Sequence, residues 1–255
     1  GGGWAADDGQ AALAMVTDVT DTAREALKVG ARKRIDEFES LQAAPPQAKA
    51  AAYRVLGYPQ IDADKRPGIG LRDDGLPDIQ WGKPVPAGTY TIGGDEAAYN
   101  SLPEQTVNID QPYQLAKYPV TYGQFQAFLE ADDGYNSQDY DWFDGLAADK
   151  NDKQMRDQYF KYANHPRERV NWYQAMAFCR WLSWRLGERV YGLDEMKDWP
   201  VRLPTEYEWE VAARYGHGKS YPWGEDEYSS GYANIDEPDR FGNNPVGPHT
   251  HYIGQ

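Results

Sequence analysis

The sequence predicts a mixed α+β fold, because two kinds of local pattern occur along the same chain. Three stretches open with a capping box, in which an N-cap side chain and a Glu or Gln three residues later bond to each other's backbone N–H groups. Two other stretches alternate apolar and polar residues with the period of two expected of half-buried strands. The capping boxes begin at Thr121, Asn171 and Thr205, and the alternating stretches are 85–94 and 105–115.

Composition limits the class of protein and of partner. The chain has 255 residues, of which 40% are hydrophobic, and this is enough for one large domain or one domain with an appendage. A formal charge of -14 argues against nucleic acid or an anionic membrane as a partner. No apolar run approaches a membrane span, and no signal-peptide pattern opens the chain. The single cysteine, Cys179, excludes an internal disulfide framework, so we expect a cytoplasmic protein.

Residues 1–57 are predicted to form a helical N-terminal extension. Apolar residues recur at helical spacing up to position 41, Pro45-Pro46 interrupts the pattern, and 48–56 is predicted as one more helix that ends at Gly57. We interpret the extension as an appendage or the tail of an upstream domain, with an autonomous partner-binding hairpin as the alternative. Residues 58–83 carry many Pro, Gly and Asp, which favours a linker or an extended wrap rather than core.

Residues 84–255 are predicted to form the main domain. Its first strand, 85–94, places Tyr90 and Ile92 on one face, and 105–115 is the next strand. The helices after Thr121 and Asn171 each carry an apolar stripe. The stripe residues are Phe125, Phe128 and Leu129 in the first helix, and Trp172, Ala175, Met176, Cys179, Leu182 and Leu186 in the second, which ends at Gly187.

Three side chains that stand out as possible functional residues are interpreted as structural. Cys179 lies on the apolar stripe and is interpreted as a small core residue. His165 precedes a helix cap beside a proline, which favours packing over a role as catalytic base. In the third helix, Trp209 falls on one face with two alanines, Ala212 and Ala213, and this face is predicted to pack tightly against another element.

The segment 132–162 is an acidic insertion with many aromatic residues, and two interpretations stay open. Aromatic side chains in an irregular polar segment provide contact area at low entropic cost, which favours a surface that recognises a ligand or partner. Alternatively, the same side chains anchor a long loop to its own domain. The candidate surface residues are Tyr135, Tyr140, Trp142 and Phe143.

The most specific pattern lies at 202–214, which reads Arg-Leu-Pro-Thr-Glu-Tyr-Glu-Trp-Glu-Val-Ala-Ala-Arg, with Tyr-Pro-Trp-Gly at 221–224. These residues resemble the central signature of the formylglycine-generating-enzyme (sulfatase-modifying factor) family. The resemblance implies a C-type-lectin-like architecture rich in irregular loops. Activity does not follow from it, because many members of the family are not enzymes. Segments 66–71 and 75–81 resemble the lead-in of members fused to bacterial signalling or defence proteins.

The same resemblance implies a structural calcium site at 233–241. In the family, an Asn-Ile pair and a later Asp-x-Phe bind calcium through two side chains and two main-chain carbonyls, and the matching residues here are Asn234, Ile235, Asp239 and Phe241. Calcium prefers such hard oxygen ligands. The alternative is a solvated acidic loop without a metal. A second pair of candidate ligands, His249 and His251, lacks a third partner and is interpreted as exposed loop.

The resemblance covers about residues 78–255 and corresponds to the front portion of the family domain. The family continues into a Gly-Asn-Val-Trp-Glu-Trp block, an Arg-Gly-Gly-Ser-Trp block and a terminal strand, which do not occur in this sequence. A sheet without its partner strands exposes an edge and an apolar face, so we expect a C-terminal segment or a second chain to complete the fold. In the enzymes of the family, that later portion holds the paired cysteines that bind copper.

The first function hypothesis is a non-catalytic domain that recognises a protein or small ligand within a larger bacterial signalling or defence protein. It rests on the lead-in, the lone cysteine and the aromatic insertion. The alternative is a copper-dependent oxidase that converts a substrate cysteine to formylglycine, with its catalytic cysteines in the later segment. An iron-dependent sulfoxide synthase is disfavoured, because it calls for a histidine-rich helical domain upstream and residues 1–57 contain no histidine.

Overall fold

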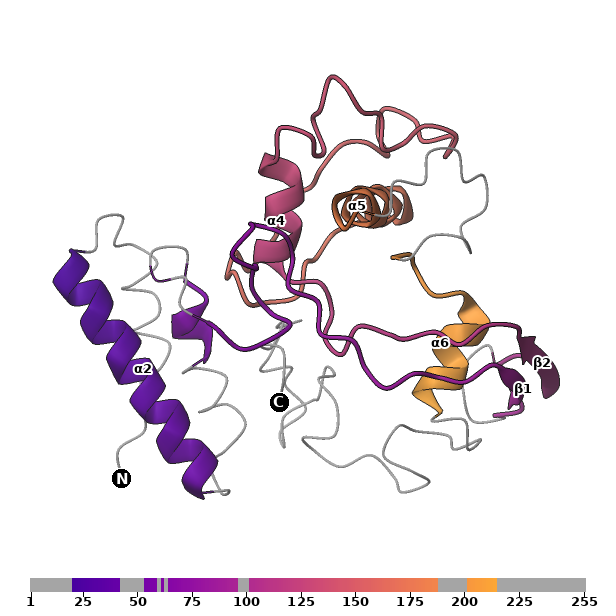
Figure 1. Cartoon of the computed structure of the whole chain (residues 1–255), viewed down its shortest axis with the longest axis horizontal. Helices are drawn as coiled ribbons and strands as arrows, with labels where there is room; N and C mark the ends of the chain where they lie inside the picture. Colours follow the sequence, from indigo (N-terminus) through magenta and orange to yellow (C-terminus); the bar gives the residue numbers. More distant parts are fainter. Residues whose placement is uncertain are drawn as a thin grey trace, which may run out of the picture.

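The computed structural model describes residues 20–41, 53–58, 61, 64–95, 101–187 and 201–214. Within these residues the chain forms helices and one antiparallel strand pair, which agrees with the predicted α+β class. Helix α2 lies at one end of the molecule, the β1–β2 pair and α6 lie at the other, and α4 and α5 lie between them (Figure 1). In chain order the elements are α2 (Asp21–Leu41), β1 (Gly88–Ile92), β2 (Gln105–Ile109), α4 (Tyr122–Glu130), α5 (Trp172–Arg185) and α6 (Glu206–Ala213).

All three predicted capping boxes are present. At the start of α4, Thr121 Oγ1 accepts a hydrogen bond from the Gln124 N–H at 3.2 Å, and Gln124 Oε1 accepts one from the Thr121 N–H at 3.0 Å. The boxes that begin α5 and α6, at Asn171 and Thr205, contain the same two bonds. Helix α5 also ends where predicted, because Gly187 follows it with a φ of 87°, a left-handed conformation that favours glycine.

The helical prediction for the N-terminal extension is confirmed in part. Helix α2 covers Asp21–Leu41, and a helical turn at 53–56 precedes Gly57. The other predicted helical positions of this region, 8–19 and 42–52, lie outside the described residues.

The two strands pair in antiparallel fashion but are shorter than predicted. Tyr90 lies opposite Val107 in the register, and Ile92 is fully buried, as the alternation indicates. Strand β2 ends at Ile109 instead of continuing to 115 because Pro112, which has no N–H group, interrupts the ladder. Pairing resumes beyond this gap, where Val85 and Tyr113 exchange backbone hydrogen bonds of 2.8 and 3.1 Å.

Helices α4 and α5 enclose the main core through aromatic side chains. Phe125 stacks on Phe178 with ring centroids 5.3 Å apart, and Phe128 contacts Trp181 at 5.2 Å. The buried face of α5 includes the middle of the predicted apolar stripe but not its two ends. Its terminal members, Trp172 and Leu186, are exposed, whereas Met176, Cys179 and Leu182 are buried as expected.

The wrap at 64–83 contributes to this core, in contrast to the prediction that it lies outside it. Ile69 and Leu76 are buried, at 1% and 5% exposure. The buried side-chain amide of Gln124 donates to the carbonyl oxygens of residues 68, 70 and 78 at 3.3, 3.1 and 2.6 Å. An irregular segment needs such partners for its backbone when it is buried, and Gln124 supplies them.

Helix α6 packs on the strands through a different face from the predicted one. Trp209 was expected to be buried, but 61% of it is exposed. The buried residues of α6 are Glu208 and Val211, and Val211 joins Ile92 and Val107 in a small apolar cluster. This face can be buried because the Glu208 carboxylate is paired with Arg202, as described below.

Candidate functional site

The charged residues of the signature segment are bonded to one another and to the strands. The Arg202 guanidinium donates two hydrogen bonds to the Glu208 carboxylate, both at 2.6 Å. The same carboxylate accepts the Thr205 N–H at 2.8 Å. The hydrogen bonds from Arg202 hold the pKa of Glu208 below its ordinary value, although burial acts in the opposite direction. A carboxylate held in this way is a structural anion rather than a proton carrier.

A second set of contacts fixes α6 to the start of the loop after β1. Glu210 Oε1 accepts the Gly93 N–H at 2.7 Å, while Arg214 donates to the Gly93 carbonyl at 2.9 Å and to Glu210 at 3.0 Å. In addition, the Tyr113 hydroxyl donates to the Glu208 carbonyl at 2.6 Å, and burial raises the pKa of Tyr113 to about 12. The acidic and basic signature residues therefore hold the fold together at this end of the molecule.

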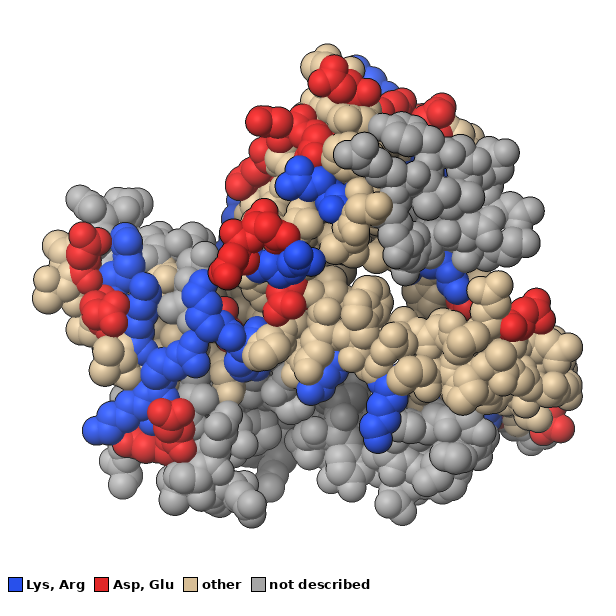
Figure 2. Space-filling model, viewed as in Figure 1, with Lys and Arg blue, Asp and Glu red and all other residues tan. Residues whose placement is uncertain are grey.

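A cleft of about 1120 Å³ opens beside the start of α6. Among the described residues, three separate segments line it: 81–84, 108–115 and 201–208, joined by Leu186 from the end of α5. Figure 2 shows that uncharged side chains dominate much of the visible surface at this end of the molecule, whereas acidic side chains gather over the 131–160 segment. The cleft is formed only when segments more than a hundred residues apart come together.

The rim of the cleft combines exposed aromatic surface with polar side chains. Trp81 and Tyr207 line it and are 40% and 41% exposed, and Leu186 is also exposed. Amide and carboxylate side chains that can donate or accept hydrogen bonds also line the cleft. Besides Tyr113, Arg202, Thr205 and Glu208, which form the internal contacts described above, the polar residues are Asn108, Asp110, Gln111, Gln114 and Glu206. Apolar walls with a few polar groups are typical of binding sites, and the rim has the chemistry to hold a polypeptide or an organic ligand.

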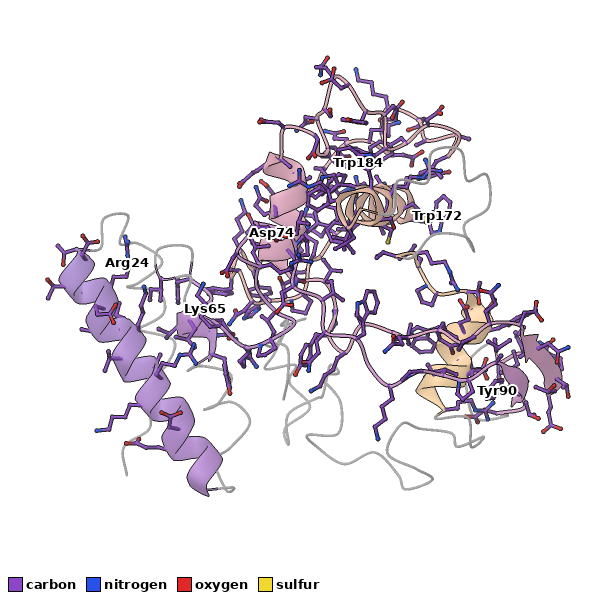
Figure 3. The ribbon with its side chains drawn as sticks, viewed as in Figure 1. Arg24, Lys65, Asp74, Tyr90, Trp172 and Trp184 are labelled. Atoms are coloured by element: carbon purple, nitrogen blue, oxygen red, sulfur yellow. The ribbon has the colours of Figure 1, made fainter. Side chains whose placement is uncertain are left out.

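The four aromatic residues predicted as a recognition surface pack inward instead of lining the cleft. Trp142 and Phe143 are buried, and Tyr135 and Tyr140 are partly exposed. The Trp142 indole N–H donates to the Gly134 carbonyl at 3.0 Å. Tyr140 and Trp142 stack at 5.4 Å and both contact Trp184, which lies on the side of α5 that faces this segment (Figure 3). This packing matches the alternative interpretation, in which the aromatics anchor the loop.

The other candidate residues fall into two groups. The predicted calcium ligands Asn234, Ile235, Asp239 and Phe241 lie outside the described residues, as do His249 and His251. Cys179 is buried in the core, and burial raises its pKa to about 12, so its thiol stays protonated at neutral pH. His165 is fully buried against the ring of Tyr162, at a centroid distance of 4.7 Å, which agrees with a packing role.

Sequence reasoning missed the cleft residues. Trp81 belongs to a turn-rich segment that is interpreted as a wrap. Tyr207 lies within the signature, where the pattern indicates a capped helix and does not mark this residue. A lone exposed aromatic residue in each segment carries no periodic signal. Across the described part of the chain, no group of three or more His, Cys, Asp or Glu side chains is arranged to hold a metal ion. In the same part, every helix is too short or too polar to cross a membrane.

Comparisons with known proteins place the chain in a family. A family model described as sulfatase-modifying factor enzyme 1-like domain matches residues 84–249. The chain is 27% identical over 175 residues to a formylglycine-generating enzyme of Thermomonospora curvata, which covers 55% of this chain and 51% of that enzyme. It is 27% identical over 156 residues to a hercynine oxygenase of Mycobacterium tuberculosis, covering 53% of this chain and 32% of the oxygenase.

A third relative is a protein kinase. The serine/threonine-protein kinase Pkn1 of Chlamydia trachomatis is 28% identical over 145 residues, which covers 56% of this chain and 21% of the kinase. The chain thus spans between 21% and 51% of the length of these three curated relatives. Since the family model covers more than half of the chain, this protein belongs to the sulfatase-modifying factor enzyme 1-like domain family.

Proposed function

We propose that this chain is a recognition module of a larger bacterial signalling or defence protein in the cytoplasm, and that it binds an extended polypeptide in the cleft beside α6. The observation that carries the proposal is the rim, where Trp81, Tyr207 and Leu186 expose apolar surface around about 1120 Å³ of space. Exposed aromatic residues that surround a concavity are the usual anchors of protein–protein contacts.

The chemistry of the rim favours a polypeptide as the occupant. The aromatic faces accommodate apolar side chains, while the exposed amide of Gln111 matches backbone N–H and C=O groups. The Asn108 oxygen already accepts the Thr89 hydroxyl, and the Gln114 amide already donates to the Gly82 carbonyl, so each has only part of its hydrogen-bonding capacity left. The polypeptide is either a further segment that completes a C-type-lectin-like fold or a separate partner. The chain matches 21% of the length of a protein kinase, and this similarity supports the proposal that the chain is one module of a signalling protein.

The charged signature residues support binding rather than catalysis. Arg202, Glu208 and Glu210 each form hydrogen bonds within the fold, so these three side chains are structural, whereas Glu206 is exposed at the rim of the cleft. The one cysteine of this sequence lies in the core. A buried protonated thiol does not fit copper, which binds thiolates, so Cys179 gives no support for the oxidase alternative.

The oxidase remains the competing function, because formylglycine-generating enzymes are among the relatives. The two functions separate in one sample. The larger protein that carries this chain, including the segment that would hold the catalytic cysteines, is incubated with copper(I), oxygen and cysteine-containing peptides, and the peptides are examined by mass spectrometry. The recognition proposal expects no peptide cysteine to be converted to formylglycine. Catalytic conversion of a peptide cysteine to formylglycine would overturn it.

Binding in the cleft is tested with a displayed library of random peptides. Peptides selected on the wild-type chain are expected to lose about tenfold or more in affinity for a Trp81→Ala, Tyr207→Ala double variant. Trp209→Ala is the matched control, since Trp209 is on the same helix as Tyr207 and is more exposed, but does not line the cleft. Equal binding to all three proteins, or failure to select any peptide, would reject the cleft as the binding site.

A structural calcium ion is part of the same proposal, with Asn234, Ile235, Asp239 and Phe241 as its ligands. The donor set supports it, because two carbonyl oxygens and two side-chain oxygens suit a hard cation. Titration with calcium alone is expected to raise the unfolding temperature of the wild type and to leave that of Asp239→Ala unchanged. Equal responses of both proteins would place any bound calcium elsewhere.

A further inference from the structure

The N-terminal extension is docked on the main domain through a compact junction. Ala31 of α2 and residues of the helical turn at 53–56 belong to one apolar cluster, and Tyr162 of the domain packs against this cluster. Tyr58 and Tyr162 meet edge to face with their ring centroids 5.0 Å apart. The buried members of this cluster are Ala31, Tyr53, Leu56, Tyr58 and Ile61. The extension therefore has an apolar interface of its own, separate from the core between α4 and α5.

A buried polar clip lies at the centre of the junction. The Asn164 side-chain amide donates to the Tyr53 carbonyl at 2.7 Å and to the Asp64 carboxylate at 2.9 Å. Asp64 also pairs with Arg66 at 2.7 Å, and its side chain is only 4% exposed. The Arg66 guanidinium lies 3.9 Å from the centre of the Tyr53 ring, within range of a cation–π contact. One asparagine thus joins the extension, the wrap and the domain.

A line of backbone hydrogen bonds runs from this clip into the domain. The Ala163 N–H donates to the Gly57 carbonyl at 2.6 Å, and the Ala163 carbonyl accepts the Gly123 N–H at 2.9 Å. The next residue pair repeats the pattern, since the Tyr122 N–H donates to the His165 carbonyl at 2.7 Å. Tyr122 and Gly123 are the first two residues of α4. The segment 162–167 is therefore bonded to the extension on one side and to the start of α4 on the other.

The fit at this point requires glycine. A Cβ atom on Gly57 would overlap the Asn164 side chain, and a Cβ atom on Gly123 would crowd the Ala163 carbonyl. Close backbone approach leaves little room for the two sides to shift independently. The same segment continues through Arg169, whose φ of 55° is rare for a residue other than glycine, to the N-cap of α5 at Asn171.

We propose that this junction is a conformational coupling device, which transmits displacements of the N-terminal extension to the starts of α4 and α5. Buried polar networks are either satisfied or broken, so they switch between discrete arrangements instead of deforming gradually. A pull on α2 that separates Tyr53 from Asn164 breaks the clip and frees segment 162–167. The inference rests on the junction alone and is independent of what the cleft binds.

Amide hydrogen exchange of the full chain under native conditions tests the coupling. Asn164→Ala is expected to accelerate exchange by about tenfold or more in 53–58 and also at the amides of Tyr122 and Gly123, because it removes two buried hydrogen bonds. The amide of Tyr113, which bonds Val85 far from the junction, is expected to keep its wild-type rate. Asn136→Ala, at an exposed asparagine, is the matched control.

A second variant guards against simple misfolding. Asp64→Asn keeps the shape of the clip but removes the charge that pairs with Arg66, and it is expected to give the same pattern at smaller amplitude. Acceleration confined to 53–58, with Tyr122 and Gly123 unchanged, would show docking without transmission and overturn the proposal. Equal acceleration at Tyr113 in both variants would show global unfolding and overturn it as well.

Discussion

Replacement of Glu208 by alanine is expected to cost about 3–4 kcal/mol of the free energy of unfolding. The side chains of Glu208 and Arg202 are only 10% and 19% exposed, and two hydrogen bonds of 2.6 Å join them. Removal of one partner from a well-buried pair costs about 3–5 kcal/mol. Because Arg202 keeps some contact with solvent and a hydrogen bond to the Leu203 carbonyl, we take about 2–3 kcal/mol for this part.

The remaining loss comes from the helix cap. Glu208 accepts the Thr205 N–H in the capping box, and loss of a cap costs about 1 kcal/mol. Glu208→Gln keeps one oxygen that can accept this N–H, but it loses the charge and replaces the oxygen that accepts the second Arg202 hydrogen bond by an NH2 group, so it is expected to cost about 2–3 kcal/mol. The difference between the unfolding free energies of the two variants therefore measures the contribution of the cap. The loss in Glu208→Gln alone measures the contribution of the pairing with Arg202.

The assay is urea unfolding at pH 7, followed by tryptophan fluorescence. A double-mutant cycle of Glu208→Gln with Arg202→Met is expected to give a coupling energy of about 2 kcal/mol. Arg72→Met is the control, because Arg72 and Asp74 also pair at 2.7 Å but are both 46% exposed, where such pairs contribute less than about 1 kcal/mol. A coupling energy below about 0.5 kcal/mol would refute the view that this signature pair holds α6 in place.

Three further predictions follow from particular residues. Gly93→Ala is expected to lower the free energy of unfolding in urea by more than Gly75→Ala does. Both glycines have a positive φ, but of the two only Gly93 would place a Cβ atom against main-chain carbonyl oxygens. Equal losses in the two variants would contradict this. Cys179 is expected to resist a thiol-specific reagent at pH 8 in the native chain and to react after unfolding in urea; fast native labelling would place the thiol at the surface. Burial raises the pKa of Asp64, but the hydrogen bonds and charge of Arg66 outweigh it, so the folded pKa lies below the ordinary 3.8. Its stabilisation is therefore present above that value and is lost as the pH falls through the folded pKa, and Asp64→Asn is expected to reduce the acid sensitivity of the unfolding free energy; an unchanged pH dependence would contradict this.

The sequence by itself determined where the helices begin and which strands alternate. A capping box acts between residues three apart, so the starts of α4, α5 and α6 at Thr121, Asn171 and Thr205 are visible without a structure. Family membership was likewise predictable, because the signature at 202–214 is continuous in the chain. The core position of Cys179 followed from its place on an apolar stripe.

Only the tertiary structure decided which faces are buried and where a ligand fits. Spacing alone grouped Trp209 with two alanines, yet α6 turns Trp209 outward because Arg202 neutralises Glu208 and Val211 meets the strands. The cleft is assembled from segments 81–84, 108–115 and 201–208, and no local pattern records that such distant segments meet. The junction at Asn164 depends in the same way on contacts 100 and 111 residues apart in the chain, with Asp64 and Tyr53. Contacts of this range depend on the packing of the whole chain, whereas capping and alternation depend on neighbours alone.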